Sequence, residues 1–273
     1  MSLSADFAFT QGSLGDYADC ARRFELRYIK RLRYPALEVN QALEYERRLR
    51  RGNRFHKLVQ QHLLGLPADL LAASLSDDAD LARWWENYRQ HGLAGLPRER
   101  QAEITLQTTL GGQRLLAQYD LLALERGGAA VIVDWKTGER VPSRQYLQSR
   151  MQTVVYRYVL ARAGGHLYGG EIPPERIRME YVYVAQGGQR VSLPYSAAEM
   201  AEDEARLLGM IQAIGEAAEF PLTEDQRRCR FCTYRAFCGR GEAGDLREFV
   251  EDDDGEDDEG IALDFDQIAE IEF

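Results

Sequence analysis

The order of the sequence patterns predicts a mixed α/β or α+β fold in which a central sheet is flanked by helices. Helical periodicity dominates the start of the chain, residues 103–136 alternate between apolar and polar positions, and helical periodicity then returns around one more strand-like segment. A chain of 273 residues can bury one sizeable core. We therefore expect one folded domain over residues 1–250 and an acidic segment over residues 251–273.

The first expected elements are helices. Residues 16–30 and 43–64 show helical periodicity, and another helical region follows at residues 69–91. In the second of these segments, Gly52 and His56 fall on the same stripe as the apolar residues. That stripe is expected to face the interior, so His56 is predicted to point inward.

Three consecutive strands are then expected, because apolar and polar residues alternate with a period of two. They are predicted at residues 103–110, 114–124 and 129–136. The pairs Gly111-Gly112 and Gly127-Gly128 separate them and suit tight turns between antiparallel neighbours. A helix at residues 145–163, a strand at 179–185 and a helix at 196–219 complete the expected order.

The charge of the chain is unevenly distributed. The net charge is −10, but twelve of the 44 acidic residues lie in residues 251–273, which contain no Lys or Arg. The remaining residues carry 34 basic and 32 acidic side chains, and Cys20–Lys57 alone has a balance of +8. Such clustered positive charge either binds a phosphate backbone or forms a solvated helix face.

No segment is apolar and long enough to cross a bilayer, and no cleavable targeting segment is visible at the start. The sequence therefore predicts a soluble, cytoplasmic protein without a membrane partner.

The end of the third predicted strand carries charge where burial is expected. In the stretch AVIVDWKTGE, Asp134 and Lys136 are two residues apart and share one face, while Trp135 faces the other way. A hairpin would bring Asp120 of the preceding strand close to Asp134. Two neighbouring carboxylates repel unless a cation lies between them, and a lysine beside such a cation suits phosphodiester hydrolysis. An isolated tripeptide of this kind would equally suit an ordinary salt bridge.

Together with three other motifs, this strand end resembles the PD-(D/E)xK nuclease superfamily, and within it the RecB-like exonuclease branch. The four motifs occur in the order of that branch and span residues 16–240. They are Gly52-x-x-x-His56, Asp120, Asp134-Trp135-Lys136 and Gln152-x-x-x-Tyr156.

The resemblance implies a restriction-endonuclease-like core and a divalent cation, Mg²⁺ or Mn²⁺, as cofactor. It implies that His56, Asp120 and Asp134 hold the metal and that Lys136 orients the nucleophile. Gln152 and Tyr156 would place the substrate strand or a catalytic water. From the residues alone, His56 could instead be a core histidine, Tyr156 could simply pack, and Glu103 could be either a further carboxylate ligand or a solvated strand end.

The cysteines suggest a second metal centre. Cys229, Cys232 and Cys238 form a C-x2-C-x5-C run, and Cys20 precedes them by 209 residues. In a cytosolic chain, this grouping favours metal binding over disulfides. It resembles the four-cysteine pattern of AddB-like subunits and CRISPR adaptation nucleases, which implies a 4Fe-4S cluster that joins the N- and C-terminal parts. Zinc is the alternative.

Together these features predict a metal-dependent deoxyribonuclease, most simply an exonuclease on single strands or DNA ends, acting in CRISPR adaptation, recombinational repair or defence. The alternatives are a catalytically weak DNA-binding subunit of a helicase-nuclease complex and a zinc-stabilised structural protein. Residues 251–273 are expected to be a disordered solubilising tail, with docking on a protein partner or folding over the basic groove as the other options.

Overall fold

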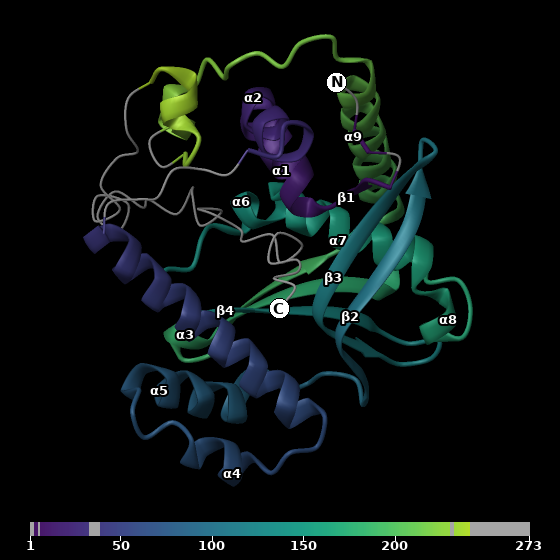
Figure 1. Cartoon of the computed structure of the whole chain (residues 1–273). Coiled ribbons are helices and arrows are strands. Elements are labelled where there is room, and N and C mark those ends of the chain that lie inside the picture. The colour runs from purple at the N-terminus through teal and green to yellow at the C-terminus, as the bar shows by residue number, and fades with distance from the viewer. Residues whose placement is uncertain (1–2, 5, 33–38, 230–231, 241–273) are drawn as a thin grey trace.

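The computed structural model describes residues 3–4, 6–32, 39–229 and 232–240. In this part of the chain, a six-stranded mixed sheet has helices on both faces (Figure 1). The predicted mixed α/β class, with a central sheet flanked by helices, is confirmed. The end of the predicted domain and the acidic segment 251–273 lie outside the described residues.

The sheet contains the four predicted strands and two that were not predicted. The strands are β1 (Ala8–Phe9), β2 (Glu99–Leu110), β3 (Gln113–Leu124), β4 (Ala130–Lys136), β5 (Ile177–Tyr183) and β6 (Gln189–Pro194). Sequence periodicity missed β1 because it has two residues, and β6 because its partly exposed sequence lacks clear alternation.

β3 lies at the branch point of the sheet. β2 pairs with β3 in antiparallel orientation along almost its whole length. On the other side of β3, β1 pairs in parallel at Arg114 and Leu115, and β4 pairs in antiparallel orientation from Leu121 to Leu124. β4 then pairs in parallel with β5, which pairs in antiparallel orientation with β6. Within the described sheet, residues 116–119 of β3 therefore have β2 as their only strand neighbour.

Three of the predicted helices are interrupted in the structure, whereas the helix predicted at residues 43–64 is continuous and begins earlier, at Val39. The helices are α1 (Gln11–Asp19), α2 (Ala21–Phe24), α3 (Val39–Leu63), α4 (Ala68–Ala73), α5 (Ala79–Asn87), α6 (Arg144–Ser149), α7 (Met151–Ala163), α8 (Gly165–Tyr168) and α9 (Ala197–Glu216). Extended backbone at Cys20 and Arg150 divides two of the predicted helices. A third predicted helix is divided before α5, where the Asp78 side chain caps the new helix by accepting from the Leu81 N–H. None of the described helices combines the length and apolar character needed to cross a membrane.

Two apolar cores lie on opposite faces of the sheet. α1, α7 and α9 cover one face, and α3 and α5 cover the other (Figure 1). On β4, Ile132 packs into the first core, whereas Val133 and Trp135 pack into the second. This alternation leaves Asp134 and Lys136 on the α7 side, which is the arrangement that the two-residue period predicts.

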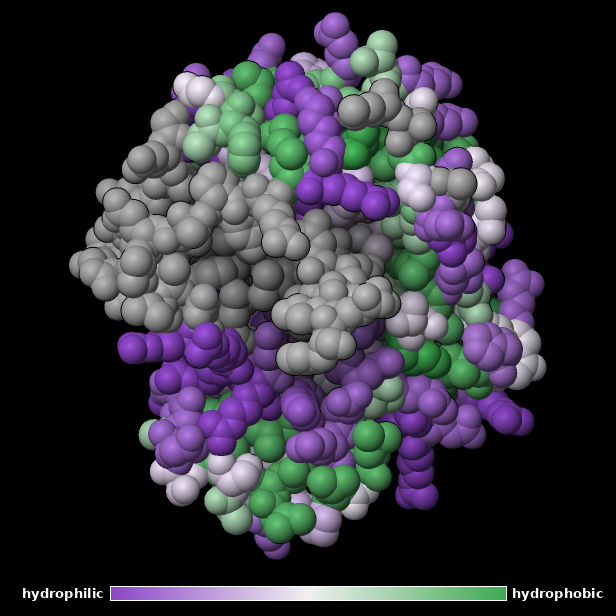
Figure 2. Space-filling model, in the orientation of Figure 1, coloured by the Kyte–Doolittle hydropathy of each residue, from purple (hydrophilic) through white to green (hydrophobic). Residues whose placement is uncertain are grey.

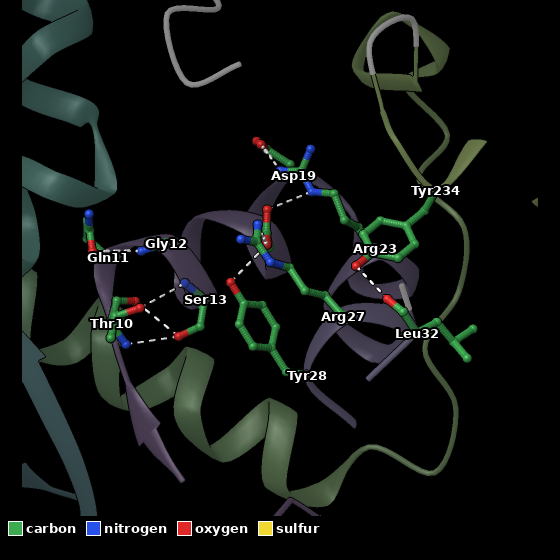
Figure 3. A network of polar contacts seen from close by, with 11 residues as sticks. Thr10, Gln11, Gly12, Ser13, Asp19, Arg23, Arg27, Tyr28, Leu32 and Tyr234 are labelled. Atoms are coloured by element: carbon green, nitrogen blue, oxygen red, sulfur yellow. Dashed lines mark hydrogen bonds and ion pairs between the residues drawn. The ribbon is translucent and has the colours of Figure 1, made fainter. Parts of the chain in front are cut away.

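The last described segment returns to the N-terminal helices. The Arg22 N–H donates to the Pro221 carbonyl at 3.1 Å, and the Phe24 and Phe220 rings stack at 6.0 Å. The Tyr234 hydroxyl donates to the Leu32 carbonyl at 3.0 Å (Figure 3). These contacts hold the two ends of the described chain together by packing and hydrogen bonds.

We expect Phe220→Ala to lower the free energy of unfolding by about 3–5 kcal/mol, because it removes a buried ring from a well-packed core. Chemical denaturation of the two proteins measures this difference. A loss below about 1 kcal/mol, the size usual for a surface substitution, would show that this contact does not hold the ends together.

Candidate active site

Three side chains from separate elements form a group of potential metal ligands. His56 of α3, Glu103 of β2 and Asp120 of β3 each place one ligand atom within 4.8 Å of the others. The His56 Nδ1 atom lies 3.3 Å from the Asp120 Oδ2 atom. All three side chains are partly accessible, so an ion and a substrate group can reach them.

Glu103 joins this group at a point where the side chains of two paired strands switch from one face of the sheet to the other. Along β3, Tyr119 packs into the first core, whereas Leu121, two residues later, packs into the second. The pairing with β2 has the same register on both sides of this point, so both strands change face at the level of Glu103 and Asp120, which are not themselves paired. Glu103 has a φ of 50°, which is uncommon for a residue other than glycine and often marks a functional site.

Asp120 stands where β3 and β4 separate. Their ladder ends at Leu121↔Val133, and the Trp135 N–H donates to the Asp120 Oδ2 atom at 3.0 Å. Beyond the end of the ladder, the Asp120 carboxylate therefore accepts the hydrogen bond from the β4 backbone. This bond fixes the carboxylate next to the end of β4.

The electrostatics of the group favour a cation. Burial raises the pKa of Asp120 to about 6, and the charges of Asp134 and Glu103 add to the rise, although the His56 imidazole opposes it. Burial also raises the pKa of Glu103. Two carboxylates that repel each other, with an imidazole beside them, fit a divalent cation such as Mn²⁺ or Mg²⁺, which would neutralise the carboxylates.

Asp134, Lys136 and Gln152 form a second, adjoining group. Lys136 Nζ lies 3.0 Å from Asp134 Oδ2 and donates to Gln152 Oε1 at 3.1 Å. Gln152 Nε2 in turn donates to Asp134 Oδ1 at 2.6 Å. The three side chains therefore form a closed triangle, and this pattern of partners fixes the orientation of the Gln152 amide.

A buried hydroxyl network supports this triangle from β5. Tyr181 lies opposite Asp134 in the strand pairing, and its ring centre is 5.6 Å from Lys136 Nζ. Its hydroxyl is 2.8 Å from Thr153 Oγ1, whose own hydrogen goes to the Leu147 carbonyl at 2.6 Å. Tyr181 is therefore the donor, to Thr153 Oγ1 and, at 3.4 Å, to Gln152 Oε1. Sequence reasoning missed Tyr181, although its position in a strand beside the charged strand end could have indicated it.

The structure brings most of the predicted residues together, in two groups rather than one. His56 and Asp120 are adjacent as predicted, but Glu103 completes their group, whereas the Asp134 carboxylate is held by Lys136 and Gln152. Tyr156, which was predicted to place the strand, is buried next to Tyr119, whose hydroxyl donates to the Tyr156 carbonyl at 2.9 Å. The catalytic roles of these residues remain predictions.

The cysteine prediction requires correction. Cys20, Cys229, Cys232 and Cys238 are free thiols, and among the described residues no three cysteine sulfurs lie within 4.8 Å of one another. They are not gathered for the predicted 4Fe-4S cluster. Burial raises the pKa of Cys232 and Cys238, with smaller contributions from the other two thiols, so the four share one region. An Asp19–Arg228 ion pair and the Tyr234 contact hold that region together, in place of a cluster.

The sheet with helices on both faces, the His56–Glu103–Asp120 group and the charged end of β4 beside it suit a metal-dependent hydrolase. The chain matches the family model of the PD-(D/E)XK nuclease superfamily over residues 8–239, and it belongs to that superfamily. No protein with curated annotation matches it.

A solved structure shares the fold. A protein of Eubacterium rectale described as a candidate exonuclease aligns with a TM-score of 0.50 and 11% identity, covering 84% of this chain and 93% of that one. A second structure, SSO0001, aligns with a TM-score of 0.41 and 13% identity, covering 86% of this chain and 87% of that one. The RecB-like branch is a finer assignment and remains a prediction.

Proposed function

We propose that the protein is a divalent-metal-dependent deoxyribonuclease that acts on single strands or DNA ends. The observation that carries the proposal is the convergence of His56, Glu103 and Asp120 beside the Asp134–Lys136 pair. Membership of the superfamily supports hydrolysis of a phosphodiester bond. The preference for DNA, and for an exonuclease reaction, follows the sequence motifs.

Each group has a distinct part in this proposal. His56, Glu103 and Asp120 would hold the cation, which supplies Lewis acidity toward the phosphate and lowers the pKa of a bound water. Lys136 stands next to this group with its ammonium held by Asp134 and Gln152. From there it can orient the attacking water and stabilise the negative charge that develops on the phosphate oxygens. Tyr156 is buried, so we assign it a packing role behind Gln152.

A cleavage assay tests the proposal. We expect the purified protein to degrade end-labelled single-stranded DNA when Mg²⁺ or Mn²⁺ is present, and to lose this activity in EDTA because the chelator removes the cation that supplies Lewis acidity and activates the water. Activity should return when metal is added in excess. Closed circular duplex DNA, which has no ends, is the matched control and should resist cleavage. Cleavage that persists in EDTA, or no cleavage with either metal, would contradict the proposed function.

A further inference from the structure

One stripe of α3 continues from the candidate site to the surface. Arg48, Gly52 and His56 are spaced four residues apart, so they lie on the same side of the helix, one turn after another. His56 faces Asp120, and a Cβ at Gly52 would lie 3.5 Å from the Thr137 hydroxyl, just beyond the end of β4. The side of α3 that carries Arg48 is therefore the side that faces the candidate site.

A neighbouring stripe of α3 forms ion pairs within the protein. Arg51 forms ion pairs with Asp78 and Asp80 at 2.9 and 2.8 Å, and Arg54 pairs with Asp77 at 3.1 Å. These contacts join α3 to the segment around α5. Arg47 lies one turn before Arg51, so it belongs to this second stripe.

Arg48 is exposed and forms no ion pair or hydrogen bond with any residue that the structure describes. Figure 2 shows hydrophilic side chains gathered over the visible part of α3. Eight residues of α-helix separate Arg48 from His56, which is about 12 Å along the helix axis. A B-form strand covers this distance in about three to four nucleotides at ~3.4 Å each, and an extended single strand covers it in fewer.

We propose that Arg48 binds a backbone phosphate of the substrate strand a few nucleotides away from the bond that is cleaved. The side of α3 that carries Arg48, Gly52 and His56 then forms a track for the strand. Gly52, which has no side chain, lies between the two contacts and next to the Thr137 hydroxyl. Arg48 is a binding residue in this scheme, because it lies too far from the carboxylates to touch the reacting phosphate. The assignment rests on the proposed function for the identity of the site.

The first test compares Arg48→Ala with Arg47→Ala, which removes the same charge from the adjacent stripe. Binding of a labelled single-stranded oligodeoxynucleotide is followed by fluorescence anisotropy in EDTA at several salt concentrations. We expect Arg48→Ala to weaken binding about fivefold near 0.1 M salt and to reduce the salt slope by about 0.7, the contribution of one phosphate contact. Arg48→Lys should restore most of the affinity. Equal effects of the two alanine substitutions, or no effect of Arg48→Ala, would overturn the proposal.

The second test uses turnover. With the oligonucleotide as substrate, Arg48→Ala should raise KM several-fold and leave kcat unchanged, because the contact is the same before and during the reaction. With bis(4-nitrophenyl) phosphate, a diester too short to reach Arg48, variant and parent should be equally active. A loss on the short diester would contradict the track. The binding test does not depend on turnover. If the parent protein cleaved no DNA, the proposed function would be wrong, but the binding comparison of the Arg48 and Arg47 variants would still test the phosphate contact.

Discussion

Replacement of Asp134 by alanine is expected to reduce kcat for DNA cleavage by at least about a thousandfold. The Asp134 carboxylate accepts from Gln152 at 2.6 Å and lies 3.0 Å from Lys136 Nζ, so its loss releases both side chains from the position in which they face the ligand group. Single-turnover cleavage of labelled DNA measures the change. Because Asp134 is only 4% exposed, alanine also leaves the Lys136 charge without its partner in a mostly buried position.

A second substitution at Asp134 separates the effect on stability from the effect on catalysis. Asp134→Asn keeps the volume and can still hydrogen bond with Gln152, so it should lose less stability than Asp134→Ala and should be inactive. Asp203→Asn is the matched control, because Asp203 is also buried and lies 3.4 Å from Arg157 on the other side of α7. It should change stability and leave kcat unchanged. Activity in the Asp134→Asn protein close to that of the parent would remove Asp134 from the catalytic machinery.

Substitution of Glu103 by glycine is expected to stabilise the metal-free protein and weaken its metal binding. Glycine adopts a φ of 50° without strain, and the substitution removes one of the carboxylates that raise the pKa of Asp120. We expect the free energy of unfolding to rise by about 1 kcal/mol, the strain relieved less the entropy that glycine adds. The Mn²⁺ concentration needed for half-maximal activity should rise at least about tenfold.

Glu103→Ala separates the two causes. Alanine removes the carboxylate but retains the unfavourable backbone, so it should lose metal affinity to the same extent and be less stable than Glu103→Gly by about 1 kcal/mol. Denaturation in EDTA measures the stabilities, and Mn²⁺ titration of activity measures the metal dependence. Equal stability of the two variants would show that the backbone at Glu103 is not strained, and unchanged Mn²⁺ dependence would exclude Glu103 as a ligand.

Much of the site could be predicted because it follows from simple periods. The two-residue period of β4 places Asp134 and Lys136 together, and the helical period of α3 turns His56 inward. The order of the motifs indicated that Asp120 would join them. The hairpin between β3 and β4 then brings Asp120 to the end of β4, as the glycine turn predicts.

The remaining features depend on backbone geometry and on distant contacts. Glu103 joins the ligand group because the side chains of β2 and β3 switch faces of the sheet at this level. Nothing in the sequence around Glu103 indicates its positive φ. The break between α6 and α7 at Arg150 follows neither a proline nor a glycine. Tyr181 supports Gln152 only because β4 and β5 pair in a particular register. The iron-sulfur prediction relied on cysteine spacing, which does not determine how far apart the sulfurs lie in the fold.

The central claim is that His56, Glu103 and Asp120 bind one divalent cation beside Asp134 and Lys136. Crystals soaked in Mn²⁺ and measured for anomalous scattering test it directly. The account predicts one strong peak within about 2.0–2.3 Å of ligand atoms from all three side chains, the distance typical of first-row divalent metals. A peak bound elsewhere, or none at this position while the protein cleaves DNA with Mn²⁺, would contradict the account.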